Sequence, residues 1–510
     1  MKKYILFTAL ITSISSFAQT ADDALKVSWF TGNGTARNIA IGGVMGSLGG
    51  DISAANINPA GLGLYKTSEF VVSPGILMNN NKFSYRGTDT SNSKSNFSNG
   101  PIGFVFGKAN TSKYSNFTSS AFSISVNQLA SYNNHVQYKG FNNFSSFSEQ
   151  YLEELVRDRA DTNAALSNYI FGSSLAFRTY LIDTIRAANG SVAGYQSLVP
   201  ITSGINQNYD AQTKGGYHEI ALSLAGNVQD KLYIGGSLTI PIVSYQKNLT
   251  YSETDATNNP NNQFASFVYQ EQFRSSGVGI GAKFGFIFKP QDSWRIGFAF
   301  HTPQIIAFTD KIRSSLVTNT ESYAHTVSET SDNLNNGAAG ERKYNITTPY
   351  HAIGSVSYVF KEVKDVRKQL GFISADVEFV NYRGARFKTQ DSENGNNISY
   401  LKQVNSSVKD YFKGNFNFKI GGELKFNVFA LRLGAAYFGS PYADENLAAS
   451  KLLATGGIGY RNKGIFIDLG YSYSFNKDVN FPYRLNDVAN TYAVQTGGTG
   501  NLMMTLGFKF

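Results

Sequence analysis

The sequence contains no cysteine among its 510 residues, so disulfide bonds cannot hold the fold together. This absence suits a large β-barrel better than a small secreted scaffold, which usually depends on disulfides. Proline is also scarce, at 11 residues. Beyond the N-terminal region there is no stretch of about 18 or more apolar residues, and this excludes a membrane-spanning helix from the rest of the chain.

Clusters of charge of one sign are also missing. The formal net charge is +9, but the Lys and Arg residues are scattered and form no basic run or basic helix. This distribution disfavours nucleic-acid binding and indicates solvated loops and lumen charges beside anionic outer-leaflet lipid. The slightly negative mean hydropathy, −0.23, is compatible with a membrane barrel, because only alternate residues of a barrel strand face lipid.

Motifs that carry catalytic or metal chemistry are absent as well. The segment Gly277–Gly281 lies within a predicted strand with no helix after it, so it is no nucleotide loop. The histidines have no metal-ligand spacing. They are His135, His218, His301, His325 and His351. We therefore expect no metal, no cofactor and no enzymatic activity. An outer-membrane lipase or protease is the alternative, which an assay on membrane lipid would detect.

The N-terminus has the pattern of a secretory signal peptide. Lys2 and Lys3 form a positive region, residues 4–14 are apolar, and Ser16-Phe17-Ala18 is a small-x-small cleavage site. We expect residues 1–18 to be cleaved and the mature chain to begin near Gln19. No cysteine follows, which excludes a lipoprotein anchor; an uncleaved anchor is the alternative.

The C-terminal segment alternates apolar and polar residues to its final position. Apolar side chains occupy every second position from Leu502 to Phe510. This pattern is typical of the last strand of an outer-membrane barrel, whose apolar face lies in lipid. We expect Phe508 and Phe510 to help close the barrel against its first strand. The aromatic content of 14% fits the aromatic girdles of such barrels.

Period-two patterns recur along the chain and predict an all-β fold, a fourteen-stranded antiparallel transmembrane barrel over residues 67–510. The predicted strands lie near 67–77, 99–108, 117–138, 216–228, 231–251, 264–289, 293–312, 341–360, 368–388, 410–427, 428–440, 448–461, 464–476 and 499–510. Short connections alternate with long ones, as periplasmic turns alternate with outer loops in such barrels. We expect flexible loops at 86–98 and 313–340.

The longest connection, 139–215, carries helical patterns over 149–160 and 164–188. This extracellular loop is either a lid with an apolar underside or a cap that packs over the rim. The third predicted strand is interrupted by the polar stretch 128–134, which is either a bulge or an ordinary strand end.

The segment 19–66 does not have the pattern of a barrel strand. It is dense in glycine, which permits tight turns and close backbone approach. The lumen of a fourteen-stranded barrel is too wide for side chains alone to fill. We therefore expect this segment to form a plug, or hatch, inside the lumen.

Four stretches of the hatch carry a resemblance to a known family. They are Gly34–Arg37, Gly42–Gly50, Asp51–Ala55 and the motif Asn58-Pro59-Ala60 just before the first predicted strand. In these stretches and in topology the sequence resembles the FadL/TodX family of outer-membrane transporters for hydrophobic compounds. The resemblance implies a hatch whose gating residues are Arg37, Gly42, Gly43, Asn56, Asn58, Pro59 and Ala60.

The resemblance also implies a function. We expect a monomeric protein of the bacterial outer membrane, inserted by the barrel-assembly machinery, that takes up hydrophobic small molecules such as fatty acids or hydrocarbons. In the family the solute leaves through a lateral opening where a strand is kinked. The alternative is a barrel of the same family that binds protein, such as the shuttle barrel of a type IX secretion system. The loops show no motif that identifies a substrate.

Overall fold

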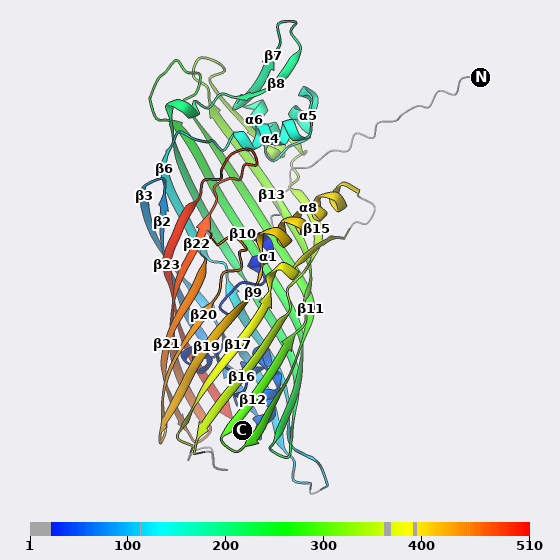
Figure 1. The fold of residues 1–510 in the computed structure, drawn as a ribbon, viewed down its shortest axis with the longest axis vertical. Helices are drawn as coiled ribbons and strands as arrows, with labels where there is room; N and C mark the ends of the chain where they lie inside the picture. Colours follow the sequence, from blue (N-terminus) through cyan, green and yellow to red (C-terminus); the bar gives the residue numbers. More distant parts are fainter. Residues whose placement is uncertain (1–21, 113, 362–368, 391–394, 446, 448) are drawn as a thin grey trace, which may run out of the picture.

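The computed structural model describes residues 22–510, apart from 113, 362–368, 391–394, 446 and 448. The predicted signal peptide, residues 1–18, lies outside the described residues. The described chain forms one tall closed barrel, with short helices inside it and at one end (Figure 1). Among the described helices, none is both long and apolar enough to cross a membrane.

The barrel has fourteen antiparallel strands, which confirms the predicted fold class. Several strands are broken into two segments by short irregularities. In barrel order they are β1 with β2 (Glu69–Val72, Pro74–Tyr85), β3 with β4 (Thr88–Asn99, Ile102–Ala109), β5 with β6 (Phe117–Ser131, Asn134–Asn142), β9 (Ile205–Val228), β10 (Leu232–Asp255), β11 (Ser266–Gln291), β12 with β13 (Trp294–His301, Ile305–Asn319), β15 with β16 (Gly340–Thr347, His351–Phe360), β17 with β18 (Gly371–Asn381, Arg386–Thr389), β19 (Gly414–Phe426), β20 (Phe429–Phe438), β21 (Ser450–Asn462), β22 (Ile465–Asn480) and β23 (Ala493–Lys509).

The last strand closes the barrel against the first. Phe70 on β1 lies opposite Phe508 on β23, and β2 continues the same ladder with the upper half of β23. Beyond β23, Ser68 and Phe510 exchange two backbone hydrogen bonds, at 3.1 and 3.0 Å. The barrel wall therefore has no free edge at the point where its two ends meet, which a membrane-spanning sheet requires.

The two ends of the barrel differ in their connections. At one end, here called the turn end, tight turns join the strands, for example Gln229-Asp230 with φ of 55° and 57°. Two consecutive positive φ values are the mark of a type I′ hairpin turn. The opposite end, here called the loop end, carries the long connections and most of the helices (Figure 1).

The outward face has an apolar band that ends abruptly toward the loop end. On β10 the outward residues are apolar up to Ile242 and polar from Ser244 onward. On β11 the same change falls between Val278 and Ser276, which stand opposite those two residues. The band is the surface expected of a membrane-spanning barrel, and the strands continue well beyond it.

One predicted flexible loop is wrong. Residues 88–98 belong to β3, and a tight turn at Arg86-Gly87 joins this strand to β2. The outward residues of this hairpin above the apolar band are polar, for example Ser91 and Ser93. The apolar–polar alternation that signals a membrane strand is therefore absent, although the backbone ladder with β2 is complete.

The loop between β6 and β9 contains helices, but not the predicted pair. α4 (Glu149–Arg157) begins as predicted. The second predicted helix, 164–188, is instead two short helices, α5 (Thr162–Ser167) and α6 (Ser173–Arg178), followed by the hairpin of β7 (Ile182–Arg186) and β8 (Val192–Ser197). β-branched residues after position 181 favour a strand over a helix.

The remaining predicted loops also contain regular structure. The segment 313–340 continues β13 and then forms β14 (Thr326–Thr330) and α7 (Ser331–Leu334), so it is no flexible loop. A long helix, α8 (Gly395–Tyr411), lies between β18 and β19. The short helical turns are η2 (Ile201–Ser203) and η4 (Tyr382–Gly384).

Candidate functional site

The segment before the first strand lies inside the barrel. It forms α1 (Asp22–Lys26), α2 (Ala36–Ala40), α3 (Ala54–Ile57) and η1 (Pro59–Leu64), drawn in blue in Figure 1. Its backbone touches the wall directly at Gly42, where φ is +70° and an added Cβ would lie 2.9 Å from the carbonyl oxygen of Ala435. A larger residue at this position would meet both backbone strain and the wall.

α2 is bound to two wall strands, β21 and β23, through its own backbone. The Thr35 hydroxyl caps the helix by accepting a hydrogen bond from the Asn38 N–H at 3.1 Å. The N–H of Ala36, at the first turn of the helix, donates to the Thr505 hydroxyl at 2.7 Å. The carbonyl of Ala40 accepts from the Thr455 hydroxyl at 2.9 Å. These bonds satisfy helix-end groups that would otherwise be buried without partners.

Arg37 joins the hatch to a buried network of charges in the wall. Its Nε donates to the Glu423 carboxylate at 3.2 Å, and its Nη1 donates to the carbonyl of Gly49 at 3.4 Å. Glu423 also accepts from Arg432 at 2.6 Å, and Arg432 in turn binds Asp468 at 2.6 Å. If Arg37 were lost, Glu423 would still be paired with Arg432. The charge balance of the wall therefore does not depend on the hatch.

The glycine-rich turn after α2 is held by a carboxylate and two serines. The backbone N–H groups of Met45 and Gly46 both donate to Asp376 Oδ2, at 3.1 and 3.0 Å. The Ser47 hydroxyl lies 2.7 Å from that of Ser355 and 2.5 Å from that of Ser357. A side chain at Gly46 would collide with Ser355, so the close approach depends on glycine.

The Asn58-Pro59 corner is buried against β10, β11 and β12. The Asn58 amide donates to the carbonyls of Gly46, Phe286 and Phe298 at 2.6, 3.2 and 3.3 Å, and its oxygen accepts from the Ala60 N–H at 3.1 Å. A Cβ at wall residue Gly285 would lie 2.1 Å from the Asn58 oxygen. The corner is thus built by a side chain that bonds both its own backbone and the wall, as Asx turns do.

The predicted hatch residues fall on two separate parts of the wall. Arg37, Gly42 and Gly43 face β19 and β20, whereas Asn58, Pro59 and Ala60 face β10 and β11. Asn56 binds Glu219 on β9 at 2.8 Å. The structure therefore brings these residues together as fastenings of one segment and not as a single binding pocket.

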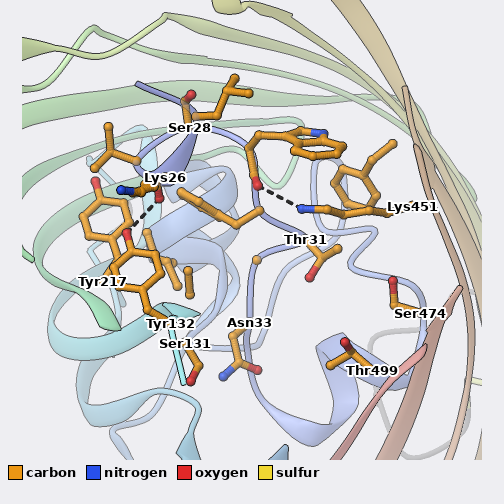
Figure 2. A pocket seen from close by; sticks show the side chains of 18 of the residues that line it. Lys26, Ser28, Thr31, Asn33, Ser131, Tyr132, Tyr217, Lys451, Ser474 and Thr499 are labelled. Atoms are coloured by element: carbon orange, nitrogen blue, oxygen red, sulfur yellow. Dashed lines mark hydrogen bonds between the residues drawn. The ribbon is translucent and has the colours of Figure 1, made fainter. Parts of the chain in front are cut away.

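A cavity of about 660 Å³ lies in the lumen above these fastenings. The first residues of the hatch form one side of it, and Figure 2 shows how they meet the wall. The Lys451 ammonium donates to the carbonyl of Trp29 at 2.9 Å and lies 3.9 Å from the centre of the Trp29 ring. The Tyr132 hydroxyl donates to the carbonyl of Lys26 at 2.7 Å.

Charged groups line this cavity beside aromatic and aliphatic ones. Lys283 donates to Glu219 and to the carbonyl of Asn56, and Lys419 lies 3.2 Å from Glu378. In α1, burial opposes the charge of Lys26, but the Asp23 carboxylate and the Tyr245 side chain together outweigh burial and hold the pKa of Lys26 above its usual range. The cavity is therefore mixed in character and can contact both an apolar body and a polar headgroup.

Three predicted hatch residues, Gly42, Gly43 and Asn56, also line the cavity, but sequence reasoning missed the rest of its lining. Trp29, Lys451, His301 and His351 belong to it, and the two histidine rings lie 5.7 Å apart. Their signal was indirect: Lys451 occupies an inward position in a strand whose other face is apolar. Among the described residues no group of His, Asp and Glu is arranged to hold a metal ion.

A seam in the wall lies beside the cavity. β4 pairs with β5, but farther toward the loop end β3 pairs with β2 and β6 pairs with β9, and within the described part of the chain no ladder joins β3 to β6. The seam begins where Asn99 donates to Gln128 at 3.1 Å. Gln128 lies in the cavity lining, as does Ser98.

The polar break in the third strand lies at the same place. The register between β5 and β9 shifts between Gln128 and Ala130, and the strand resumes as β6 at Asn134. The break is a bulge within a continuing strand, and the alternative of an ordinary strand end is wrong. A bulge bends a strand, which separates its continuation from the neighbouring strand.

Comparisons with known proteins support this fold. No protein-family model and no curated protein matches the sequence. Among solved structures, a FadL homologue from Pseudomonas aeruginosa matches with a TM-score of 0.57 and 12% identity over 94% of this chain and 99% of that one. The toluene transporters TbuX of Ralstonia pickettii (TM-score 0.51, 16% identity) and TodX of Pseudomonas putida (0.51, 13%) match over the same shares of each chain.

These likenesses define the class of the structure as a closed fourteen-stranded barrel of the FadL type. At such low identities they establish the fold alone. The resemblance read from the hatch motif and the strand pattern is thereby confirmed at the level of the fold.

Proposed function

We propose that the protein is a bacterial outer-membrane channel for the passive uptake of hydrophobic or amphipathic small molecules, and that the hatch gates it. The observation that carries the proposal is the lumen cavity between the hatch and a seam in the wall. We propose that the segment 19–66, of which the structure describes residues 22–66, is the hatch, with Arg37, Gly42, Gly43, Asn56, Asn58, Pro59 and Ala60 as its fastenings. No enzymatic activity is part of this proposal.

A side exit through the seam makes physical sense for such a solute. Moving an apolar molecule through a water-filled pore costs about 0.8 kcal/mol for each CH₂ group exposed to water. An exit at the outer limit of the apolar band delivers the solute to lipid instead. The Asn79 amide spans from β2 to the carbonyl of Asn133 at 2.8 Å, so the seam is closed by side chains that can move without breaking a ladder.

The test is uptake of labelled long-chain fatty acids and aromatic hydrocarbons by cells that express the protein. Asn58→Ala with Pro59→Gly removes the Asn58 bonds to Gly46, Phe286 and Phe298 and loosens the corner. We expect uptake to change at least severalfold while the barrel remains folded. The matched control is Asn259→Ala with Pro260→Gly, the same residue types in the loop between β10 and β11, which we expect to transport like the parent.

The outcomes separate the proposal from its rival. If the hatch variant transports like the parent at equal membrane levels, the corner has no gating role. If the parent takes up none of the compounds, small-molecule uptake is contradicted and a protein-interaction role, such as a type IX secretion shuttle, takes its place. Stable co-purification of a large partner protein would support that rival.

A further inference from the structure

A row of basic side chains crosses four neighbouring strands on the outer surface. Lys214 on β9 stands opposite Gln246 on β10, which stands opposite Arg274 on β11, and Arg274 stands opposite Lys311 on β13. All four side chains are exposed. Their neighbours along the strands face the lumen, for example Tyr245, whose ring contacts Lys26. The row therefore lies on the outside of the barrel.

The row lies just beyond the apolar band. Ser244 and Ser276 form the next outward row toward the membrane, followed by Ile242 and Val278 at the edge of the band. Four residues rise about 13 Å along a strand, or roughly 9 Å along the membrane normal at a tilt of about 45°. This height places the row at the outer edge of the headgroup layer, which extends roughly 5–8 Å outside the hydrocarbon core, and long Lys and Arg side chains can reach back into that layer.

The charges of the row are only partly balanced by protein. Among the described residues, the carboxylate of Glu341 is the one acidic group at ion-pair distance, 3.4 Å from Lys311 and 3.2 Å from Lys343. Arg274 and Lys311 are directly opposite each other on paired strands, where like charges destabilise a sheet. An anion bound between them would remove that repulsion.

We infer that this row binds the phosphate groups of an anionic glycolipid in the outer leaflet. Three strand spacings separate Lys214 from Lys311, about 14 Å, so a headgroup with more than one phosphate is needed to engage the whole row. Arg274 can bind phosphate through two parallel hydrogen bonds. Gln246, Ser244 and Ser276 supply neutral donors beside it. The inference is independent of the solute that the lumen carries.

The test is lipid retention by the full-length protein reconstituted in nanodiscs of phosphatidylcholine with a small share of diphosphorylated lipid A. The variant Lys214→Gln/Arg274→Gln/Lys311→Gln removes the row. Each basic residue near an anionic surface contributes roughly a fivefold gain in affinity, so we expect the affinity for lipid A to fall on the order of a hundredfold. Mass spectrometry of the lipid retained after detergent extraction measures the effect.

The control is Lys82→Gln, an exposed lysine on β2 whose charge Asp89 already matches at 2.9 Å. We expect it to retain lipid A like the parent, and both variants to keep the heat-modifiable gel mobility of a folded barrel. Equal lipid A retention by the triple variant and the parent would overturn the inference, and so would equal loss in the control. Displacement of lipid A by millimolar inorganic phosphate would assign the row to free anions instead.

Discussion

Two segments occupy the lumen at different levels, and the interactions that hold them differ. Near the turn end the hatch shares an apolar cluster with the wall and is also fastened by hydrogen bonds and ion pairs, such as those of Arg37 with Glu423 and of Asn58 with the carbonyl of Phe286. Near the loop end the cap, residues 143–204, fills the barrel with aromatic side chains. Phe147 packs within 4.5 Å of the Tyr251 ring and 5.2 Å of the Tyr269 ring, measured between ring centres.

The two closures differ in what their movement would disturb. The cap joins a single apolar cluster with Tyr85, Tyr138 and Tyr209 of the wall, and opening it would expose that cluster to water. A shift of the hatch would disturb its own apolar cluster with the wall, but the wall groups that bind its polar side chains keep other partners: Glu423 retains Arg432, and Glu219 retains Lys283. We expect the hatch to shift during transport while the cap stays in place, as the proposed gating requires.

Among the changes that test this comparison, deletion of residues 22–51 should have the largest effect. It removes α1, α2 and the glycine-rich turn but no wall hydrogen bond within a ladder, so the barrel should still fold. We expect a severalfold higher conductance for small polar solutes in planar bilayers. Deletion of residues 185–194, the tip of the β7–β8 hairpin outside the lumen, is the control and should leave conductance unchanged. Unchanged conductance in the hatch deletion would mean that these residues do not block the lumen.

Both closures require a wall that folds without them. The double variant Phe508→Ser/Phe510→Ser tests the last strand of this wall. Each Phe faces outward, 46% and 69% exposed to the surroundings that lipid fills. Each substitution should cost about 1.5–3 kcal/mol of apolar burial in lipid. We expect a clear loss of heat-modifiable, folded protein in the outer membrane. Thr496→Ser, on the same strand beyond the band, should behave like the parent; normal levels of the double variant would contradict the closing role of β23.

Phe147→Ala should have a smaller and local effect, on the cap alone. Phe147 is 5% exposed and touches five aromatic rings, so truncation should cost about 3–5 kcal/mol of local stability. We expect faster proteolysis between residues 143 and 204, measured on intact cells, with an unchanged barrel. Phe144→Ala, 49% exposed in the same segment, is the control. Equal proteolysis of both variants would contradict the role of Phe147 in holding the cap.

The wall was the most predictable part of the molecule from sequence. Each membrane strand must present apolar residues at every second position, as in Ile465–Asn480, and this requirement is visible in the sequence itself. The hairpin of β2 and β3 was not predicted because it lies beyond the apolar band, where its outward face is polar. The helix pattern over 164–188 failed because amphipathy does not record the break at Tyr169–Gly172.

The lumen was less predictable because its contacts join distant parts of the chain. Nothing near Arg37 indicates Glu423, and nothing near Lys451 indicates Trp29. The glycines of the hatch were visible, but their wall partners, such as Gly285 opposite Asn58, follow from the closed barrel alone. Motif and composition located the hatch in the sequence. The register of the fourteen strands determines which wall residue each hatch residue contacts.

The most direct test of a moving hatch uses the absence of native cysteine. Ser47 in the hatch and Ser357 on β16 have hydroxyls 2.5 Å apart, so Ser47→Cys/Ser357→Cys should form a disulfide that ties the hatch to the wall. Ser148→Cys/Ser197→Cys, whose hydroxyls lie 2.7 Å apart within the cap, is the control. We expect oxidation to abolish uptake of a labelled hydrophobic solute by the first variant alone, and a reductant to restore it. Uptake at the parent rate with the Ser47→Cys/Ser357→Cys disulfide intact would contradict a moving hatch.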